Sequence, residues 1–276
     1  MPTSIAMAES PNRKFDSSDA PSVSIEIVVP TLNSHHLLPG LVASLQAQSW
    51  PHWRLWFIDG PSGPEHRAWL EQCCSNESRC CWLPQDPAET GIFGAMNQGF
   101  LLAPPDAWLL FWGSDDRAAD AAVLAGAVAR IETLRRDGAD PDLLVCRGRY
   151  VHGGIPGRPS AFYWYHSYRC SMFLGSTPPH QATLIGPRAR RRLARYEDDL
   201  RLSADLDYFL RLTGFSDLAV ARSDQEFVHI EGGGISAVQT RRRLQEVRRA
   251  YRTAFGIAWP IPFVLRYIQR LLSLLA

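Results

Sequence analysis

The sequence predicts an α/β protein whose core is a mostly parallel, Rossmann-like sheet flanked by helices. Two observations lead to this prediction. Short runs of β-branched and aromatic residues alternate with segments of helical periodicity through the first half of the chain, which is the pattern of βαβ units. The runs are mainly apolar, above all 107–112, which is typical of parallel strands buried on both faces.

Each element of the first half follows from a local signal. A β-rich run at 23–29 ends at Pro30 and predicts the first strand. Leucines that repeat with helical spacing after Leu37 predict the first helix. The later elements are expected, in chain order, as a helix over 37–48, a strand over 53–58, a helix over 64–75, a strand over 80–83, a helix over 92–103, a strand over 107–112 and an Ala-rich helix over 118–135.

In the second half of the chain, predicted strands and helices alternate less regularly than in the first half. Its expected elements are strands near 142–150 and 160–171, the second rich in aromatic residues, a helix over 203–214, short strands near 218–222 and 226–230, and a helix over 240–255. We expect a flexible tail over 1–21, one domain over 22–240 with halves at 22–135 and 136–240, and basic and amphipathic C-terminal helices over 241–276.

Composition excludes several classes of protein. The 276 residues are 46% hydrophobic and 21% charged, which is ordinary for a globular chain and excludes a disordered one. The formal net charge of +1 provides no field for nucleic acid. We see no signal peptide and no apolar run of the roughly 18–20 residues that a membrane span needs. The adjacent cysteine pairs lack zinc-site spacing. These features predict a cytoplasmic protein with reduced thiols.

Polar groups follow three of the predicted strands. Pro30-Thr-Leu-Asn33, Asp59-Gly60 and Asp115-Asp116 each stand where an apolar run ends. Because ligands bind beyond the carboxyl ends of parallel strands, these groups predict one site at a single edge of the sheet. The two adjacent carboxylates favour a divalent cation such as Mg²⁺ or Mn²⁺. The alternative is that one of them only caps the helix that follows.

A series of short motifs resembles the family-2 glycosyltransferases, in the branch found in bacterial polysaccharide clusters. The resemblance covers about residues 23–240, and its motifs occur in the family's order. They are Pro30-Thr-Leu-Asn33, Asp59-Gly-Pro-Ser62, Glu89-Thr-Gly-Ile-Phe-Gly-Ala-Met-Asn-Gln-Gly99, Gly113-Ser-Asp-Asp116, Pro179-His180-Gln181, Ala204-Asp-Leu-Asp207 and Gly233-Gly-Ile-Ser236.

This resemblance implies a GT-A fold with a smaller acceptor-side subregion. It also implies an inverting transfer from a nucleotide-diphosphate sugar to a hydroxyl group of a glycan or lipid-linked acceptor, with Mn²⁺ or Mg²⁺ as cofactor. The implied donor contacts are Pro30, Thr31 and Asn33 beside the nucleoside, Asp59 and Ser62 in the second loop, and Glu89, Asn97, Asp115 and His180. Asp116 and Asp115 would hold the metal, and Asp205 would be the catalytic base.

The chain departs from the family pattern at three positions. Glu89 stands where the family usually has Asp, and the nearby Asp86 is a competitor for its role. Gly94 replaces an Asp that commonly precedes Ala-Met-Asn, and Gly113 replaces the first acid of the metal-binding pattern. These changes leave the donor contacts open.

The two acids of the 203–214 helix can be separated by spacing. Asp207 and Arg211 are four residues apart and should form an exposed ion pair. Asp205 projects from the opposite flank and is free to act as the base. The alternative is that Asp205 lies in the first turn of the helix only because acidic side chains are favourable there. His180 could contact the diphosphate or orient the acceptor, and His229 could be a metal ligand or a diphosphate contact. The alternative for each is an ordinary structural histidine.

The C-terminal segment combines an arginine cluster with an amphipathic pattern after Pro262. It could pack on the domain, form a homodimer, or bring the protein to the inner face of a membrane. Two other functions remain as alternatives to glycosyl transfer. A nucleotidyltransferase would need a Gly-rich phosphate loop after the first strand, where this chain has Pro-Thr-Leu-Asn. A non-catalytic binding module could keep the same fold.

Overall fold

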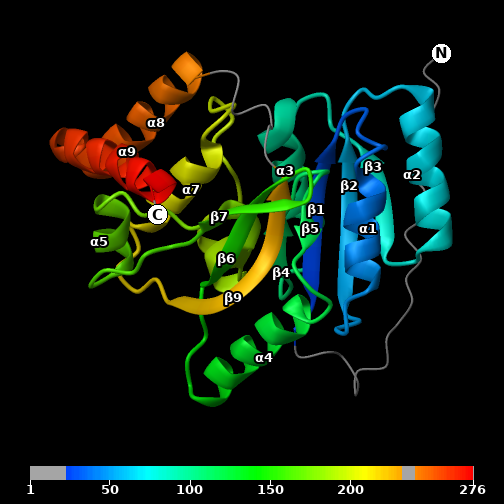
Figure 1. Ribbon diagram of the computed structural model, residues 1–276, viewed down its shortest axis with the longest axis horizontal. Helices are drawn as coiled ribbons and strands as arrows, with labels where there is room; N and C mark the ends of the chain where they lie inside the picture. Colours follow the sequence, from blue (N-terminus) through cyan, green and yellow to red (C-terminus); the bar gives the residue numbers. More distant parts are fainter. Residues whose placement is uncertain (1–22, 232–239, 276) are drawn as a thin grey trace, which may run out of the picture.

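The structure, a computed structural model, describes residues 23–231 and 240–275 (Figure 1). The predicted tail over 1–21 and the run Gly232-Gly-Gly234 lie outside the described residues.

The elements predicted for the first half are present in the predicted order. They are β1 (Ile25–Thr31), α1 (Leu38–Gln46), β2 (Trp53–Asp59), α2 (Pro64–Asn76), β3 (Cys80–Pro84), α3 (Gly91–Leu102), β4 (Trp108–Phe111) and α4 (Val123–Arg136). A short strand that was not predicted, β5 (Arg117–Ala118), lies between β4 and α4. The Ala-rich helix starts five residues later than expected, at Val123, because Arg117 and Ala118 pair with a later strand as β5.

The second half has more elements than predicted, and two of the predictions for it differ from the structure. Its elements are β6 (Leu143–His152), β7 (Ile155–Ser160), α5 (Tyr168–Phe173), η1 (His180–Ala182), β8 (Thr183–Ile185), α6 (Pro187–Arg192), α7 (Ala204–Leu212), β9 (Val220–Glu231), α8 (Thr240–Phe255), η3 (Gly256–Ala258) and α9 (Pro260–Leu275). The strand expected over 160–171 is wrong. Phe162 and Trp164 pack against the core from a non-strand segment, and Ser167 caps α5 by accepting a bond from the Cys170 N–H. The two strands expected at 218–222 and 226–230 are one continuous strand, β9.

The strands form a single mixed sheet in the order β3-β2-β1-β4-β8-β6-β9-β5, with β7 paired to β6. The first four strands are parallel, as predicted. Antiparallel pairing begins at β8, so the second half of the sheet is mixed. The α/β class is confirmed, and the carboxyl ends of β1, β2, β3 and β4 all lie at the same edge of the sheet.

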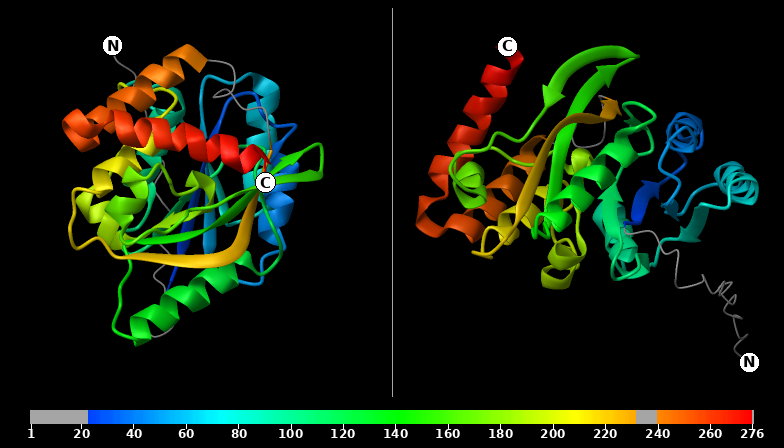
Figure 2. Two further views of the ribbon diagram at one scale, coloured as in Figure 1. Left: turned by 60° about the vertical axis from the view of Figure 1, so that its left-hand side comes forward. Right: turned by 90° about the horizontal axis from the view of Figure 1, so that it is seen from below.

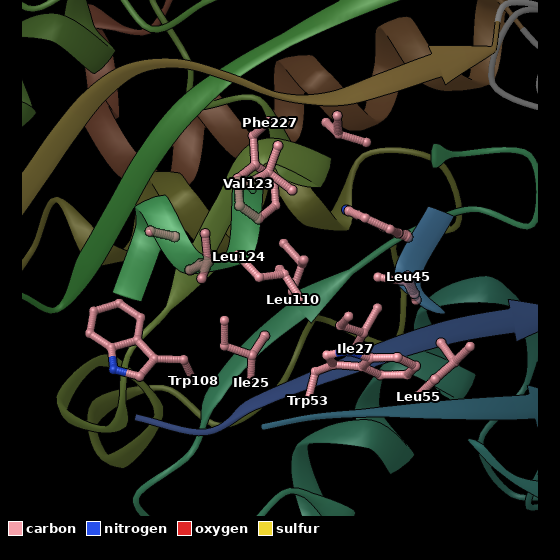
Figure 3. Packing of buried hydrophobic residues seen from close by; sticks show 14 of the residues in the cluster. Ile25, Ile27, Leu45, Trp53, Leu55, Trp108, Leu110, Val123, Leu124 and Phe227 are labelled. Carbon is pink, nitrogen blue, oxygen red and sulfur yellow. The ribbon is translucent and has the colours of Figure 1, made fainter. Parts of the chain in front are cut away.

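Both faces of the sheet are buried, which explains the apolar strands. On one face Ile25, Ile27 and Val29 of β1 pack with residues of α1 and α4. Figure 3 shows Ile25 and Ile27 in this core, with Leu45 of α1 and Val123 and Leu124 of α4. On the other face Val28 packs with residues of α3 and α7. Alternate residues of one strand thus enter two different cores.

Helices α8 and α9 lie against one another at the end of the molecule that also holds α5 and α7 (Figures 1 and 2). Among the helices of the described residues, none is both long and apolar enough to span a membrane.

Candidate active site

The polar groups that follow β1, β2 and β4 meet at one edge of the sheet, as the sequence predicts. Thr31 and Asp59 are register partners at the ends of β1 and β2. Ser114, after β4, lies with its Oγ 2.8 Å from Ser34 Oγ, and it donates to the Pro30 carbonyl oxygen at 3.4 Å. Three separate strand ends are therefore connected by side chains.

The Asp59 carboxylate organises the first two loops. Its Oδ1 accepts hydrogen bonds from Thr31 Oγ1 at 3.0 Å and Ser62 Oγ at 2.6 Å, and it lies 3.1 Å from His66 Nε2. All four side chains are buried. Their polar atoms contact one another inside the protein, so the buried Asp59 carboxylate fixes the conformation of both loops. Sequence reasoning missed His66, because a single histidine in the first turns of a helix gives no signal of a buried partner.

Asn33 lies in the loop that follows β1 and links it to the loop that follows β2. It has a φ of 52°, the one positive value at a non-glycine position among the described residues. Its N–H donates to Ser62 Oγ at 2.9 Å, and its Oδ1 accepts from the Gly63 N–H at 2.8 Å. Asn tolerates this left-handed conformation better than most residues. The loops that follow β1 and β2 are therefore locked together, with Asn33 exposed and Pro30 half-buried on their outer surface.

The two aspartates after β4 have different environments. Asp116 is 1% exposed, and its Oδ2 accepts a 2.6 Å bond from the Gly113 N–H, which closes the turn. Asp115 is only partly buried. Burial raises the pKa of Asp115, with a smaller effect of the Glu231 carboxylate, and burial raises the pKa of Asp116 well above its usual range. The prediction put Asp116 first as metal ligand. Of the two carboxylates, that of Asp115 is the more accessible.

Two of the departures from the family pattern have steric causes. A Cβ atom at Gly113 would lie 2.9 Å from Asp115 Oδ1, so a side chain there would push the accessible carboxylate away. A Cβ atom at Gly94 would collide with the backbone of Glu89. Glycine at both positions fits the local packing of this chain.

Asn97 and Glu89 make contacts within the protein. Asn97 is 4% exposed; its Oδ1 accepts from the Tyr196 N–H at 2.7 Å, and its Nδ2 donates to the Tyr196 carbonyl and to Asp198 Oδ1. Glu89 Oε1 accepts a 3.2 Å bond from Arg195 and lines a cavity of about 100 Å³. Asp86 is exposed, and its Oδ1 accepts from the Ala88 N–H. Asn97 therefore holds Tyr196 in place.

Tyr196 in turn holds His180. The Tyr196 hydroxyl lies 2.8 Å from His180 Nε2, and the imidazole stacks on Phe111 with ring centroids 5.6 Å apart. Burial lowers the pKa of His180, and the nearby Asp205 carboxylate only partly offsets this effect. The imidazole is therefore neutral at pH 7, and it stands beside β4 and Asp205.

The two acids of α7 occupy the positions that spacing predicts. Asp207 Oδ2 lies 2.7 Å from Arg211 Nε, so this ion pair is confirmed. The pair is not exposed as expected, however, because the Asp207 side chain is 7% exposed and burial raises its pKa. Asp205 lies on the other flank, partly exposed, and makes no hydrogen bond or ion pair with the described residues.

Asp205 and His180 line the same cavity of about 170 Å³. Its walls come from β7 and the segment after it, from the loop around Thr177, and from α9. The α9 helix thus contributes to the site, a role that sequence reasoning missed because the partner segments are about a hundred residues away.

His229 lies on β9, where it is the register partner of Arg117, the residue after Asp116. Its Nε2 lies 2.9 Å from Glu226 Oε1 on the same strand, so its imidazole is paired with that carboxylate. Across the described parts of the chain, no three His, Cys, Asp or Glu side chains gather in a way that could hold a metal ion. A role of His229 as a metal ligand stays a prediction.

The family follows from a match to the model of Glycosyl transferase family 2, which covers residues 26–188. The chain belongs to this family. It is accordingly a nucleotide-sugar-dependent glycosyltransferase. Similar proteins include the PGL/p-HBAD biosynthesis glycosyltransferases of Mycobacterium bovis and Mycobacterium tuberculosis, which are 27% identical over 248 residues, or 87% of this chain and 90% of each relative.

Solved structures of other glycosyltransferases share the fold. S. aureus TarS 1-349 in complex with UDP-GlcNAc aligns with a TM-score of 0.67 at 17% identity, over 90% of this chain and 73% of that chain. The mannosyltransferase PcManGT from Pyrobaculum calidifontis, in complex with GDP-Man and Mn²⁺, aligns with a TM-score of 0.61 at 14% identity, over 94% of this chain and 72% of that chain. This glycosyltransferase therefore has the predicted GT-A fold.

Proposed function

We propose that this glycosyltransferase transfers its sugar with inversion to a hydroxyl group of a glycan or lipid-linked acceptor, and that Asp205 is the general base. One observation carries the proposal. Asp205 is a carboxylate with no hydrogen bond or ion pair to the described residues, on the wall of a cavity that it shares with His180. An acid that the fold does not use is available to take a proton.

The reaction is a single displacement. The acceptor oxygen forms a bond to the anomeric carbon while its proton passes to the Asp205 carboxylate. The bond between that carbon and the diphosphate oxygen breaks, and its electron pair leaves with the diphosphate. Attack from the face opposite the leaving group inverts the configuration. Neutral His180, fixed by Tyr196, positions groups beside Asp205 without adding a positive charge that would lower its basicity.

The donor would bind across the strand ends. The outer surface of the two locked loops, at Pro30 and Asn33, would face the nucleoside, with Thr31, Asp59 and Ser62 shaping them from beneath. Support comes from the solved relatives, which bind UDP-GlcNAc and GDP-Man. Glu89 lines the smaller cavity and stays a proposed contact of the nucleobase of the donor.

A divalent metal fits the turn after β4. The carboxylates of Asp115 and Asp116 are adjacent, and burial raises the pKa of both, so a cation would stabilise their charged forms. Oxygen ligands suit Mg²⁺ and Mn²⁺, which commonly complete their coordination with substrate phosphates and water. Asp115 would be the direct ligand, and Asp116 would hold the turn through Gly113. When bound, the ion would neutralise charge on the leaving diphosphate.

Calorimetry tests this function. UDP-, GDP- and dTDP-sugars would be titrated into the full chain with Mn²⁺ present, and release of nucleoside diphosphate would be followed with and without metal. We expect one nucleotide class to bind, and Asp115→Asn to lose the metal-dependent part of its affinity. Asp106→Asn is the matched control, because this exposed acid lies just before β4, at its other end. Metal-dependent binding that survives in Asp115→Asn would contradict the metal assignment.

We also propose that α9 brings the enzyme to an anionic membrane surface, where a lipid-linked acceptor would be found. Helix α9 turns its apolar side outward: Ile261, Val264, Ile268 and Leu271 are 46–60% exposed, while Arg266 is 8% exposed. An outward apolar stripe is the arrangement of a helix that lies in a membrane interface.

The neighbouring helix supplies matching charge. Helix α8 carries exposed arginines at 241, 242, 248, 249 and 252, and its one acid, Glu246, is buried against Arg201 and Leu202. Basic residues near an anionic surface contribute about 1 kcal/mol each. The stripe defined above and these arginines therefore favour a lipid surface over an uncharged partner.

Vesicle sedimentation tests the membrane proposal. Wild-type protein should sediment with vesicles that contain phosphatidylglycerol, less so at high salt, and Val264→Ser with Ile268→Ser should weaken this binding. Leu101→Ser is the matched control, since Leu101 is 81% exposed on α3. If the double variant sediments like wild type but converts a dimer to a monomer, the stripe binds a second copy and the membrane proposal is wrong.

A further inference from the structure

The two ring nitrogens of His180 have different surroundings. Nε2 lies 2.8 Å from the hydroxyl oxygen of Tyr196, whereas Nδ1 makes no hydrogen bond with the described residues and is accessible. His180 lines the cavity of about 170 Å³ that Asp205 also lines. A neutral imidazole carries one ring N–H; the nitrogen with the hydrogen donates, and the other accepts. The position of this hydrogen therefore decides what His180 offers to a ligand in the cavity.

The surroundings of Tyr196 make its hydroxyl group the donor of this hydrogen bond. The Tyr196 side chain is buried, and His180 Nε2 is the one hydrogen-bond partner of its hydroxyl group among the described residues. If Nε2 carried the hydrogen and donated, the hydroxyl hydrogen of Tyr196 would be buried without an acceptor. A buried donor without an acceptor is costlier than an oxygen with a spare lone pair. The Tyr196 O–H therefore donates to Nε2, and the imidazole hydrogen lies on Nδ1.

Burial keeps both groups in the forms that this hydrogen bond requires. It raises the pKa of Tyr196 well above its usual range, so the hydroxyl group keeps its hydrogen. Burial also lowers the pKa of His180, so the imidazole is neutral at pH 7. With its hydrogen on Nδ1, the neutral ring can donate a hydrogen bond from that atom but cannot accept a proton there.

Packing fixes the positions of both rings. Asn97 binds the N–H and the carbonyl group of Tyr196. The imidazole of His180 stacks on Phe111 and meets the edge of the Phe209 ring. The Tyr196 ring has four aromatic neighbours with ring centroids 5.1 to 5.4 Å away, which are Phe93, Phe100, Phe111 and Tyr208. The Tyr196 hydroxyl group is therefore held opposite Nε2.

We propose that Tyr196 is a positioning residue that fixes His180 as the tautomer with its hydrogen on Nδ1, and that Nδ1 donates a hydrogen bond to the reacting hydroxyl group of the acceptor. The oxygen of that group has one hydrogen and two lone pairs. The hydrogen passes as a proton to the Asp205 carboxylate, one lone pair forms the bond to the anomeric carbon, and the other accepts from Nδ1. The proposal rests on the proposed role of Asp205 and deepens it, because it assigns the orientation of the acceptor hydroxyl group to His180.

The tautomer also separates the roles of His180 and Asp205. With its hydrogen on Nε2, His180 would present the lone pair of Nδ1 to the cavity and could itself take the proton of the acceptor, as histidine does in many enzymes. The hydrogen bond from Tyr196 removes this lone pair from the cavity. Asp205 is then the member of this pair that can act as the base.

Nuclear magnetic resonance of the full chain, with ¹⁵N in its histidines, tests the tautomer directly. A ring nitrogen that carries a hydrogen and one that does not resonate at clearly different ¹⁵N frequencies, and couplings to the ring hydrogens distinguish Nδ1 from Nε2. His180→Gln identifies the His180 signals among those of the 8 histidines. At about pH 7.5 we expect the hydrogen on Nδ1 in wild type. Tyr196→Phe keeps the ring and removes the hydroxyl group, so its hydrogen should move to Nε2, the preferred position in a free histidine side chain.

Tyr208→Phe is the matched control. The Tyr208 side chain is buried in the same aromatic cluster, but its hydroxyl group donates to the Leu193 carbonyl oxygen at 3.0 Å and not to a histidine. This variant should keep the His180 hydrogen on Nδ1. Hydrogen on Nε2 in wild type would overturn the proposal without the need for any variant. The same tautomer in Tyr196→Phe and wild type would overturn the role of Tyr196.

Hydrolysis of the donor, in which water is the acceptor, gives a second readout. The substrate is the nucleotide sugar that calorimetry identifies, and release of nucleoside diphosphate is measured. We expect the rate to fall about 3–10-fold in Tyr196→Phe, the loss of one neutral hydrogen bond, with the donor KM unchanged and Tyr208→Phe close to wild type. An equal rate in Tyr196→Phe and wild type would contradict the contact between Nδ1 and the acceptor. Failure of the base assignment is distinguished from these results, because it would leave Asp205→Asn active while the tautomer stays as expected.

Discussion

Exchange of Asp205 for asparagine is the sharpest test of the catalytic assignment. Asp205→Asn keeps the size and shape of the side chain and removes its ability to accept a proton. General-base catalysis is worth about 10²–10⁴-fold, which corresponds to about 3–5 kcal/mol in the activation free energy. We expect kcat to fall by that factor and the donor KM to change little, because the base contacts the acceptor.

The same change should hardly affect stability. Asp205 has no hydrogen bond or ion pair with the described residues, and it is only partly buried. The remaining loss is the interaction of a carboxylate with the first turn of α7, about 0.3–1 kcal/mol. Thermal unfolding of the variant should therefore shift by a few degrees at most.

Asp207→Asn is the matched control, two residues away. Asp207 is buried, and its carboxylate contacts Arg211, which is 26% exposed and also lies 3.6 Å from Glu197. Since Arg211 keeps a second acid, we expect a loss of about 1–3 kcal/mol in unfolding free energy, less than that of a fully isolated buried charge. Turnover of the folded enzyme should survive.

The assay is release of nucleoside diphosphate at saturating donor and acceptor, with urea unfolding of each variant. An inactive, normally stable Asp207→Asn together with an active Asp205→Asn would refute the assignment of the two flanks of α7.

Two further predictions concern α9 and His180. Gly175→Ala should destabilise the protein by about 1–3 kcal/mol and expose the C-terminal helices to protease, because φ is 88° and the new Cβ would collide with the backbone at Arg266; an unchanged melting temperature would contradict the close approach. Burial lowers the pKa of His180, so the unfolded chain binds its proton first, and stability should fall as pH drops below about 6.5. Urea unfolding at about pH 7.5 and 5.5 measures this loss of stability, which should be smaller in His180→Gln than in wild type. An equal loss of stability in the two proteins would show that His180 is solvated in the folded state.

Much of the first half could be predicted from sequence because its signals are local. The apolar runs of β1, β2 and β4 and the helical spacing of α1 define their elements without knowledge of the rest of the fold. The convergence of Asp59 and Asp115 followed from one topological rule about parallel strands. Even the separation of Asp205 from Asp207 needed only the helical period.

The errors occur where long-range contacts decide the structure. The aromatic residues at 162–168 have strand propensity, but Phe162 and Tyr168 enter the core shared with α7 instead of a ladder. Asn97 matches a donor-contact motif, yet it serves Tyr196, about a hundred residues away. The burial of Asp116 depends on the turn closed by Gly113, which spacing alone does not reveal.

Helix α9 shows why an amphipathic pattern does not by itself say which side faces inward. The usual expectation buries the apolar side, and here Arg266 and Gln269 face the protein while Val264 and Ile268 face outward. Such an arrangement is unfavourable in water on both sides, since it exposes apolar area and buries charge. A lipid surface would remove the first of these costs, because the exposed side chains of Val264 and Ile268 would enter the membrane interface. The outward position of these side chains is therefore physical support for the membrane proposal.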